Sequence, residues 1–266
     1  NEEEITTLGR GGSDTTAVAL AAALGAKVCE RYTDTEGIFS ADPRIVPDAR
    51  RLDEISYDEM LELATYGTKV MHPRAIELGE LYNIPILVAS SFTDSPGTLI
   101  HGGACMEVRN RVRNVAYDLD VAKVSVMGVP DRPGIAAALF EALAKAGVSV
   151  DTIVQNAGIG SLADLTFTVT RGQLAKALEV IQPIVAQMGA KDIVSDARLG
   201  KVSIIGTGMS NTPGFAARMF RTLSEKGVNI QLITTSEIRI TCIIDEAQVK
   251  EAVRALHKAF EVEIKE

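Results

Sequence analysis

The chain has 266 residues, of which 46% are hydrophobic and 23% charged, with a formal net charge of −8 and no Trp. This composition is typical of a globular protein of two or three domains, and the negative charge excludes a nonspecific nucleic-acid binder. Three scattered cysteines and three scattered histidines exclude a disulfide framework and a zinc site. With no signal peptide and no apolar run near the about 20 residues that span a bilayer, we expect a cytoplasmic protein without membrane partners.

The first clear signal lies in residues 6–16, which read TTLGRGGSDTT. An extended run ends in a glycine-rich turn, and a helix of small apolar residues is predicted over 13–24. Glycines allow close backbone approach, a helix N-terminus offers free N–H groups, and the Arg10 guanidinium suits a carboxylate or phosphate. A plain helix cap by Ser13 or Thr15 is the alternative reading. The turn predicts a site for an anion or a substrate.

Residues 28–89 alternate between predicted strands and helices. Strands are predicted over 28–32 and 84–89, helices over 57–64 and 74–82, and a loop over 33–48. Ser56 begins the first of these helices with Glu59 as its capping-box partner, and Pro73 begins the second. The βαβα order predicts an α/β layer with parallel strands. Glycines and prolines in residues 93–120 indicate a domain boundary.

Polar residues follow the predicted strand over 28–32. Ligands of open α/β sheets bind at the carboxyl ends of strands, which is where Tyr32-Thr33-Asp34 stands. The loop after it carries a ring, acids and Arg44, and such a loop suits the base and phosphates of a nucleotide. The alternative is a surface turn organised by Asp42-Pro43. Lys69 either reaches a phosphate or is a solvated lysine.

The rest of the chain is a repeat. VSVMG…PG over 124–134 returns as VSIIG…PG over 202–214. Each copy reads as the βαββαβ order of ferredoxin-like domains. The predicted inner faces of the first helices are Ala137, Phe140, Leu143 and Ala144 in one copy, and Met219, Phe220 and Leu223 in the other. We predict a first domain over 1–100, a linker over 101–120, a first repeat over 121–198 and a second repeat over 199–266, whose last strand, over 260–264, pairs with either repeat.

Matching loops of the two repeats carry polar residues. In the first repeat, Asp131 suits a ligand ammonium and the helix N-terminus after Gly134 suits a carboxylate, the two ends of a free amino acid. The pairs Gln155-Asn156 and Ser236-Glu237 end the second strand of each repeat. Turn and cap chemistry explains any one of these residues, whereas their occurrence in both copies favours a ligand. Exposed sheet edges also favour side-by-side association.

Four of these segments resemble signatures of the bacterial aspartokinase family, namely TTLGRGGSD (6–14), YTD…ADPR (32–44), GTKVMHP (67–73) and LITTSEIRI (232–240). The resemblance covers essentially the whole chain. It implies part of an α/β amino acid kinase (carbamate kinase-like) fold, followed by two α+β ferredoxin-like ACT domains. It also implies ATP-dependent phosphorylation of the aspartate side-chain carboxylate, with Mg²⁺ bridging the phosphates, as the first step toward lysine, threonine and methionine.

The same resemblance implies roles for individual residues. Catalytic roles fall on Arg10, Ser13 and Asp14, and aspartate binding on Arg10, Gly11, Gly12 and Ser13. The nucleotide site comprises Tyr32, Thr33, Asp34, Ile38, Phe39, Ser40, Ala41, Asp42, Pro43, Arg44 and Lys69. The effector site comprises Asp131, Gly134, Ile135, Ala136, Ser149, Val150, Asp151, Gln155 and Asn156 of the first repeat, with Phe215, Ala216, Asn229, Ile230, Ser236 and Glu237 of the second repeat of a partner chain.

The resemblance further implies inhibition by lysine, threonine or both, and a homodimer or higher oligomer that forms through the ACT domains. The sequence departs from the family by lacking its Lys-Phe-Gly-Gly segment, and about 140 residues are missing by comparison with a whole kinase domain. We therefore expect no measurable kinase activity from these 266 residues alone. The alternative function is a stand-alone amino-acid-binding regulatory subunit without catalysis.

Overall fold

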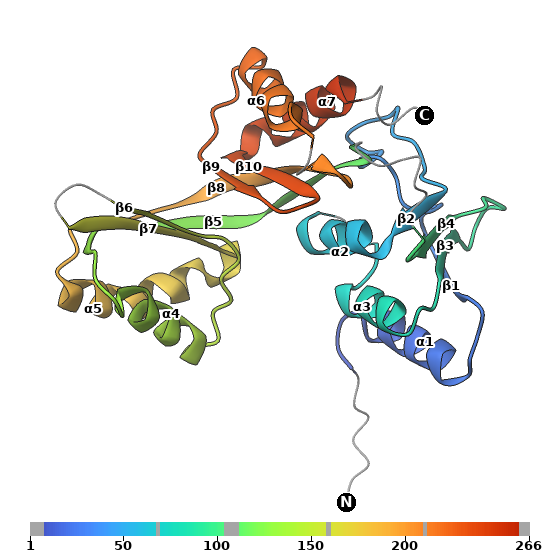
Figure 1. The fold of residues 1–266 in the computed structure, drawn as a ribbon, viewed down its shortest axis with the longest axis horizontal. Helices are drawn as coiled ribbons and strands as arrows, with labels where there is room; N and C mark the ends of the chain where they lie inside the picture. The colour runs from blue at the N-terminus through green and yellow to red at the C-terminus, as the bar shows by residue number, and fades with distance from the viewer. Residues whose placement is uncertain (1–7, 68–69, 104–111, 158–160, 210–211, 261–266) are drawn as a thin grey trace, which may run out of the picture. The chain divides into compact units, whose positions relative to one another are not determined.

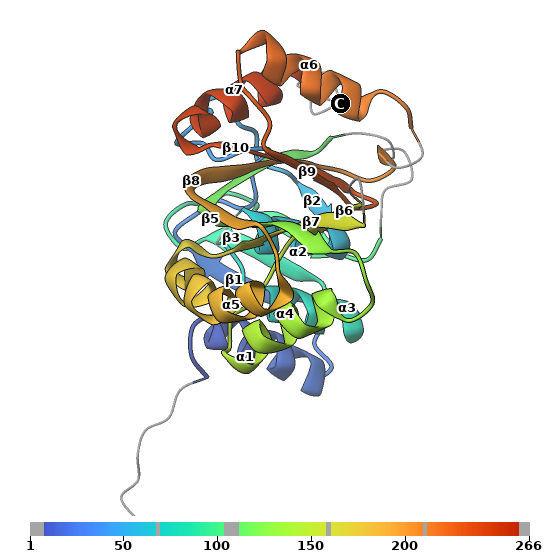
Figure 2. The ribbon, with the colours of Figure 1, turned by 90° about the vertical axis from the view of Figure 1, so that its left-hand side faces the viewer.

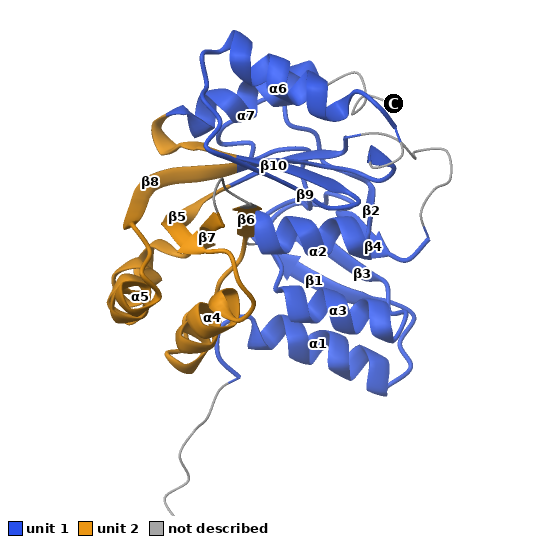
Figure 3. Cartoon of the chain, turned by 60° about the vertical axis from the view of Figure 1, so that its left-hand side comes forward, with its two compact units in different colours: residues 1–117, 202–242, 248–266 blue, residues 118–201, 243–247 orange. Residues whose placement is uncertain are grey.

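The structure, a computed structural model, describes residues 8–67, 70–103, 112–157, 161–209 and 212–260. Lys69 and the predicted strand beyond Phe260 lie outside these residues. The chain forms two compact units (Figure 3). Unit 1 contains residues 1–117, 202–242 and 248–266, and unit 2 contains residues 118–201 and 243–247. The second repeat therefore packs largely with the N-terminal residues.

The N-terminal part of unit 1 is a four-stranded sheet with three helices on one face (Figure 1). Its elements are α1 (Gly12–Ala23), β1 (Cys29–Thr33), β2 (Glu54–Ser56), α2 (Tyr57–Tyr66), α3 (Pro73–Leu81), β3 (Ile86–Ser90) and β4 (Thr98–His101). The three predicted helices and the two predicted strands are confirmed. Ser56 and Glu59 form the predicted capping box at the start of α2, and Pro73 is the first residue of α3.

The predicted parallel arrangement is confirmed for the two predicted strands, β1 and β3, whereas β4, which the sequence did not predict, runs antiparallel to β3. The strand order is β1-β3-β4-β2, in which β1 pairs with β3 and β2 with β4 in parallel, while β3 and β4 are antiparallel. Residues 91–97 join β3 to β4. This connection is too short for a crossover, which needs about a dozen residues, so the chain turns back on itself.

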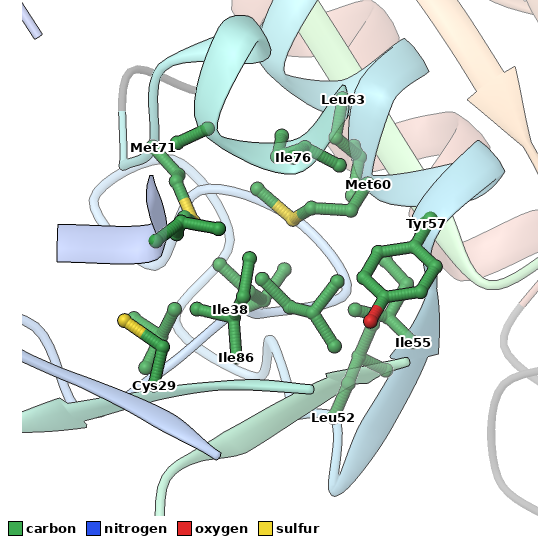
Figure 4. Close-up of a cluster of buried hydrophobic side chains, with 14 of the residues drawn as sticks. Cys29, Ile38, Leu52, Ile55, Tyr57, Met60, Leu63, Met71, Ile76 and Ile86 are labelled. Carbon is green, nitrogen blue, oxygen red and sulfur yellow. The ribbon is translucent and has the colours of Figure 1, made fainter. Parts of the chain in front are cut away.

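One apolar core joins this sheet to its helices. Ile55, Met60, Ile76 and Ile86 are each at most 1% exposed and meet between α2, α3 and the strands (Figure 4). Ile38, from the loop after β1, is 2% exposed and belongs to the same cluster. Since such burial stabilises by about 1.5–3 kcal/mol per large apolar side chain, the core fixes where that loop begins.

The rest of the chain forms a six-stranded sheet with the order β6-β7-β5-β8-β10-β9. Its elements are β5 (Asn114–Pro130), α4 (Ile135–Lys145), β6 (Ile153–Ala157), β7 (Leu162–Val169), α5 (Leu174–Met188), β8 (Asp192–Ile205), α6 (Phe215–Glu225), β9 (Leu232–Thr235), β10 (Arg239–Asp245) and α7 (Val249–Ala259). The first repeat has the full predicted βαββαβ order. In the second, α6 and α7 lie side by side over β9 and β10 (Figures 1 and 2).

Two strands extend beyond the repeat in which the sequence placed them. β8 is one continuous strand that ends the first repeat and begins the second. β5 begins at Asn114, within the predicted linker over 101–120. Just before it, the Arg113 N–H donates to the Ile205 carbonyl at 2.8 Å. The start of β5 thus flanks β8 on the side where a fourth strand of the second repeat would lie.

The predicted inner face of α4 is only partly correct. Leu139 and Leu143 are buried, and Phe140 is half-buried with its ring edge-on to Phe167 at 5.6 Å. Ala137 and Ala144 are exposed, because the buried stripe of α4 runs through Leu139 and Leu143, whose larger side chains bury more apolar area than an alanine does. In α6, Met219 and Leu223 are buried as predicted, and Phe220 is half-buried. None of the helices within the described residues is long and apolar enough to cross a bilayer.

Candidate functional site

The glycine-rich turn leaves the start of α1 without a side-chain cap. Gly11 is the N-cap with φ +76°, and Ser13 lies inside the helix, where it is exposed. Thr15 donates its Oγ1 hydrogen to the Gly11 carbonyl at 3.1 Å instead of accepting from the helix. The alternative of a cap by Ser13 or Thr15 is therefore wrong. The first-turn N–H groups lie beside the exposed Arg10 and suit an anion.

Both the space around Gly11 and its backbone conformation require a glycine at this position. A Cβ atom built at this position lies 2.2 Å from Cδ2 of His72, the N-cap residue of α3. The positive φ adds strain for any other residue. The turn therefore packs against the start of α3, which fixes the position of Arg10 relative to the sheet.

Asp14 is held by two groups from distant parts of the chain. Its Oδ1 accepts from Nε of Arg31 on β1 at 2.8 Å, and its Oδ2 accepts from the backbone N–H of His72 at 3.2 Å. Sequence reasoning missed Arg31 and His72 as part of this arrangement. Nη1 of Arg31 is buried and has no hydrogen-bond partner among the described residues. The Asp14 carboxylate thus joins α1, β1 and α3 and orders the turn that carries Arg10.

The residues at the carboxyl end of β1 are largely accessible. Tyr32 is 60% exposed, and its hydroxyl donates to Glu30 at 3.0 Å, which raises the pKa of Tyr32. Thr33 donates to the exposed Asp34 carboxylate at 3.1 Å. These side chains occupy the end of the sheet where the sequence predicts a ligand.

The loop after β1 divides into a buried half and an exposed half. Ile38, Ser40 and Ala41 are at most 3% exposed, so their side chains face the protein interior, and Phe39 is half-buried. Pro43 and Arg44 are exposed. Ser40 is 0% exposed with its backbone included, and its N–H and carbonyl bond to Arg50 and Val115, so it is the exposed half of the loop that is open to a ligand.

The exposed half of the loop is a fixed turn. The Asp42 carboxylate accepts from the Arg44 N–H at 2.9 Å and pairs with the Arg44 guanidinium at 2.8 Å. It also accepts from the Tyr117 hydroxyl at 3.0 Å. The hydrogen bonds from Arg44, with a smaller one from Tyr117, lower the pKa of Asp42, while burial raises the pKa of Tyr117. The surface turn organised by Asp42-Pro43, which was the alternative interpretation of this loop, is therefore present. It exposes the Arg44 guanidinium to solvent.

The structure divides the predicted effector residues of unit 2 between two ends of the sheet. Asp131 lies beside Ser161, whose carbonyl accepts its N–H at 2.8 Å, whereas the Asp151 N–H donates to Thr168 at 3.0 Å. Leu162, the residue after Ser161, pairs with Pro130 of β5, and Thr168 pairs with Lys123 of β5. These two β5 residues are seven positions apart, which corresponds to about 23 Å along the strand. The Asp131 end also holds Gly134, Ile135, Ala136 and Asn156, the Asp151 end holds Ser149 and Val150, and Gln155 lies between them.

The second repeat shows the same division. Phe215 and Ala216 begin α6 at the end of the sheet where Ser236 and Glu237 close the turn after β9, whereas Asn229 and Ile230 precede β9 at the other end. Phe215 is buried and stacks on Phe260 at 6.3 Å, and Ser236 donates to Glu62 of α2 at 2.9 Å. No single repeat brings both groups of predicted effector residues within reach of one free amino acid.

Three segments of the chain match models of known families. Residues 1–90 match the amino acid kinase family, and residues 124–185 and 202–260 each match an ACT domain. Among proteins that are similar to almost all of this chain, an aspartokinase of Thermus thermophilus is 48% identical over 98% of this chain. The chain spans 65% of that protein, somewhat less than two thirds of its length.

Solved structures give matching results. The chain resembles Escherichia coli aspartokinase III in complex with aspartate and ADP, with a TM-score of 0.77 and 28% identity over 96% of this chain and 57% of that one. The same enzyme is also known in complex with lysine and aspartate. The regulatory subunit of aspartate kinase from Thermus thermophilus is 41% identical, with a TM-score of 0.54, over 57% of this chain and 99% of that subunit.

Proposed function

This chain belongs to the aspartokinase family, and on that premise we propose that the complete gene product transfers the terminal phosphoryl group of ATP to the side-chain carboxylate of L-aspartate. The observation that carries the proposal is the uncapped start of α1 beside the exposed Arg10. This anion site lies inside the segment that matches amino acid kinases. Phosphoryl transfer needs positioning and positive charge more than covalent chemistry, and this turn supplies both.

In this proposal each part of the site has one task. Arg10 and the first-turn N–H groups of α1 bind the carboxylates of aspartate, and Ser13 adds a hydroxyl beside them. Asp14 keeps that turn in place through Arg31. Tyr32-Thr33-Asp34 and the loop over 38–44 hold the nucleotide, with Arg44 near its phosphates. Correct alignment of the two substrates is worth several orders of magnitude in rate.

Mg²⁺ fits this site as a companion of the nucleotide. No group of three or more His, Cys, Asp or Glu side chains that would hold a metal occurs in the part of the chain that the structure describes. Mg²⁺ keeps several waters and is commonly held by phosphates with one or two carboxylates, here the exposed Asp34. When bound, it would neutralise phosphate charge.

We infer that the two repeats bind free lysine, threonine or both and thereby inhibit the enzyme. Asp131 holds the ligand ammonium, and the start of α4 holds its carboxylate. Because the predicted residues of a repeat lie at two ends of its sheet, a second copy of the chain completes the site. The edge strands β6 and β9 carry the exposed Ile153 and Ile233, which suit pairing in a dimer or higher oligomer.

The activity is tested by incubating the complete gene product with ATP, Mg²⁺ and L-aspartate and measuring ADP release. We expect release that depends on aspartate and is not supported by D-aspartate or L-glutamate. The alternative, a stand-alone regulatory subunit, predicts amino-acid binding without ADP release. Absence of aspartate-dependent release from well-folded protein would therefore favour that alternative.

The effector site is tested by calorimetric titration with lysine and threonine, separately and together. Asp131→Ala is expected to weaken binding about tenfold or more, since hydrogen bonds to charged groups are worth about 1.5–3 kcal/mol. Asp192→Ala, which removes an exposed carboxylate at the start of β8, is the matched control and should bind as the wild type does. An unchanged dissociation constant in Asp131→Ala would remove Asp131 from the site.

A further inference from the structure

Helix α7 of the second repeat contacts the loop over 38–46 through two side chains. Nε2 of His257 lies 2.9 Å from Oγ of Ser40, and Nε of Arg254 donates to the Ile45 carbonyl at 2.9 Å. The two α7 residues are three positions apart and therefore share one face of the helix. All of these residues belong to unit 1.

Ser40 is the central point of this contact. Its N–H donates to the Arg50 carbonyl and its own carbonyl accepts from the Val115 N–H, both at 2.8 Å. Its hydroxyl accepts from the Arg50 N–H at 2.9 Å in addition to the contact with His257. Ser40 therefore ties the loop to the segment around Arg50, to β5 and to α7.

The contact with His257 is buried. His257 is 4% exposed and Ser40 is fully buried, so water does not replace the hydrogen bond if one partner is removed. Loss of His257 leaves the Ser40 hydroxyl with the bond that it accepts from the Arg50 N–H, and a hydrogen bond lost in a buried place costs more than a surface one. The His257–Ser40 pair thus selects one loop conformation over others.

Within the described residues, the contacts that hold the glycine-rich turn come from elements other than α7. Gly11 and Asp14 are held by His72, the N-cap residue of α3, and by Arg31 of β1. Removal of the α7 contacts is therefore expected to loosen the loop over 38–44 and to leave the turn around Arg10 intact.

We propose that His257 and Arg254 are positioning residues for the nucleotide. They hold the loop so that its Asp42–Arg44 turn stands ready to receive ATP, and they make the second repeat part of the support of the nucleotide site. The inference rests on the proposed function of that loop. A loop that must be ordered on binding lowers affinity by the free energy of ordering it.

The test uses the complete gene product with the variants His257→Leu, His257→Gln and Arg254→Met. We expect His257→Leu to raise KM for ATP about tenfold, the equivalent of about 1.4 kcal/mol, with KM for aspartate within about twofold of wild type. His257→Gln should restore most of the affinity for ATP, because the Gln amide reaches the position of Nε2. Arg254 is exposed, so Arg254→Met should raise KM for ATP without unfolding the protein and carries the test if His257→Leu does not fold.

Val249→Ala is the matched control, because Val249 is a buried residue of α7 away from the loop contacts. It should lower the melting temperature and leave KM for ATP unchanged. An equal rise in KM for ATP in Val249→Ala, or an unchanged KM in both His257→Leu and Arg254→Met, would overturn the inference while leaving the kinase activity established. If the wild type lacks kinase activity, calorimetric titration of the wild type and the variants with ADP tests the inference independently of catalysis. A weaker affinity in the variants supports the inference, and equal affinity or no binding to the wild type overturns it.

Discussion

Arg10→Ala in the complete gene product is expected to lower kcat/KM for aspartate by about 100-fold or more. The guanidinium is exposed beside an uncapped helix start, where a carboxylate gains two charge-assisted hydrogen bonds of about 1.5–3 kcal/mol each. Each 1.4 kcal/mol lost is about a tenfold loss in rate or affinity. Steady-state ADP release at varied aspartate, with ATP saturating, measures the effect.

The accompanying variants separate recognition from folding. Arg10→Lys keeps the charge but loses the two-pronged geometry, so an intermediate loss is expected. Arg221→Ala, an exposed arginine of α6, is the matched control and should behave as the wild type. KM for ATP should change little in Arg10→Ala, because the loop over 38–44, which we propose holds the nucleotide, has separate supports. A kcat/KM for aspartate within about threefold of wild type would show that Arg10 does not bind the substrate.

The elements that the sequence predicted correctly depend on local signals. The Ser56–Glu59 capping box joins residues three positions apart, and Pro73 begins α3 by its fixed φ. The βαββαβ order of the first repeat follows from alternating apolar patterns and from the Pro-Gly pairs, whose glycines, Gly134 and Gly214, are the N-caps of α4 and α6. Such signals need no knowledge of the tertiary structure.

The features that the sequence did not predict depend on long-range pairing. The antiparallel β4, the continuous β8 and the start of β5 beside Ile205 are decided by which strands meet in the sheet. The candidate site shows the same limit. The glycine-rich turn stands out in the sequence, but the groups that hold Asp14 come from 17 and 58 residues away. Likewise, no local pattern indicates that Ser40 faces α7.

Glu59→Ala is expected to lower the free energy of unfolding by about 3–5 kcal/mol, as breaking a buried charge pair does. Glu59 is 1% exposed, and its carboxylate lies 3.6 Å from Nη1 of Arg113. It also accepts from the N–H groups of Ser56 at 3.5 Å and of Thr207 at 3.2 Å. The substitution removes the capping box and leaves a half-buried guanidinium without its counter-charge. Urea denaturation followed by circular dichroism measures the loss.

Glu59→Gln keeps hydrogen-bonding oxygen and removes only the charge, so it should lose less than Glu59→Ala. Glu77→Ala, on the exposed face of α3, is the matched control and should stay within about 0.5 kcal/mol of wild type. A loss below about 1 kcal/mol in Glu59→Ala would mean that the carboxylate is not a structural support. Because Ser56 lies in the N-terminal layer and Thr207 in the second repeat, Glu59 joins both parts of unit 1. The loss should therefore shift one common transition of unit 1, whereas two separate transitions would show that these parts unfold independently.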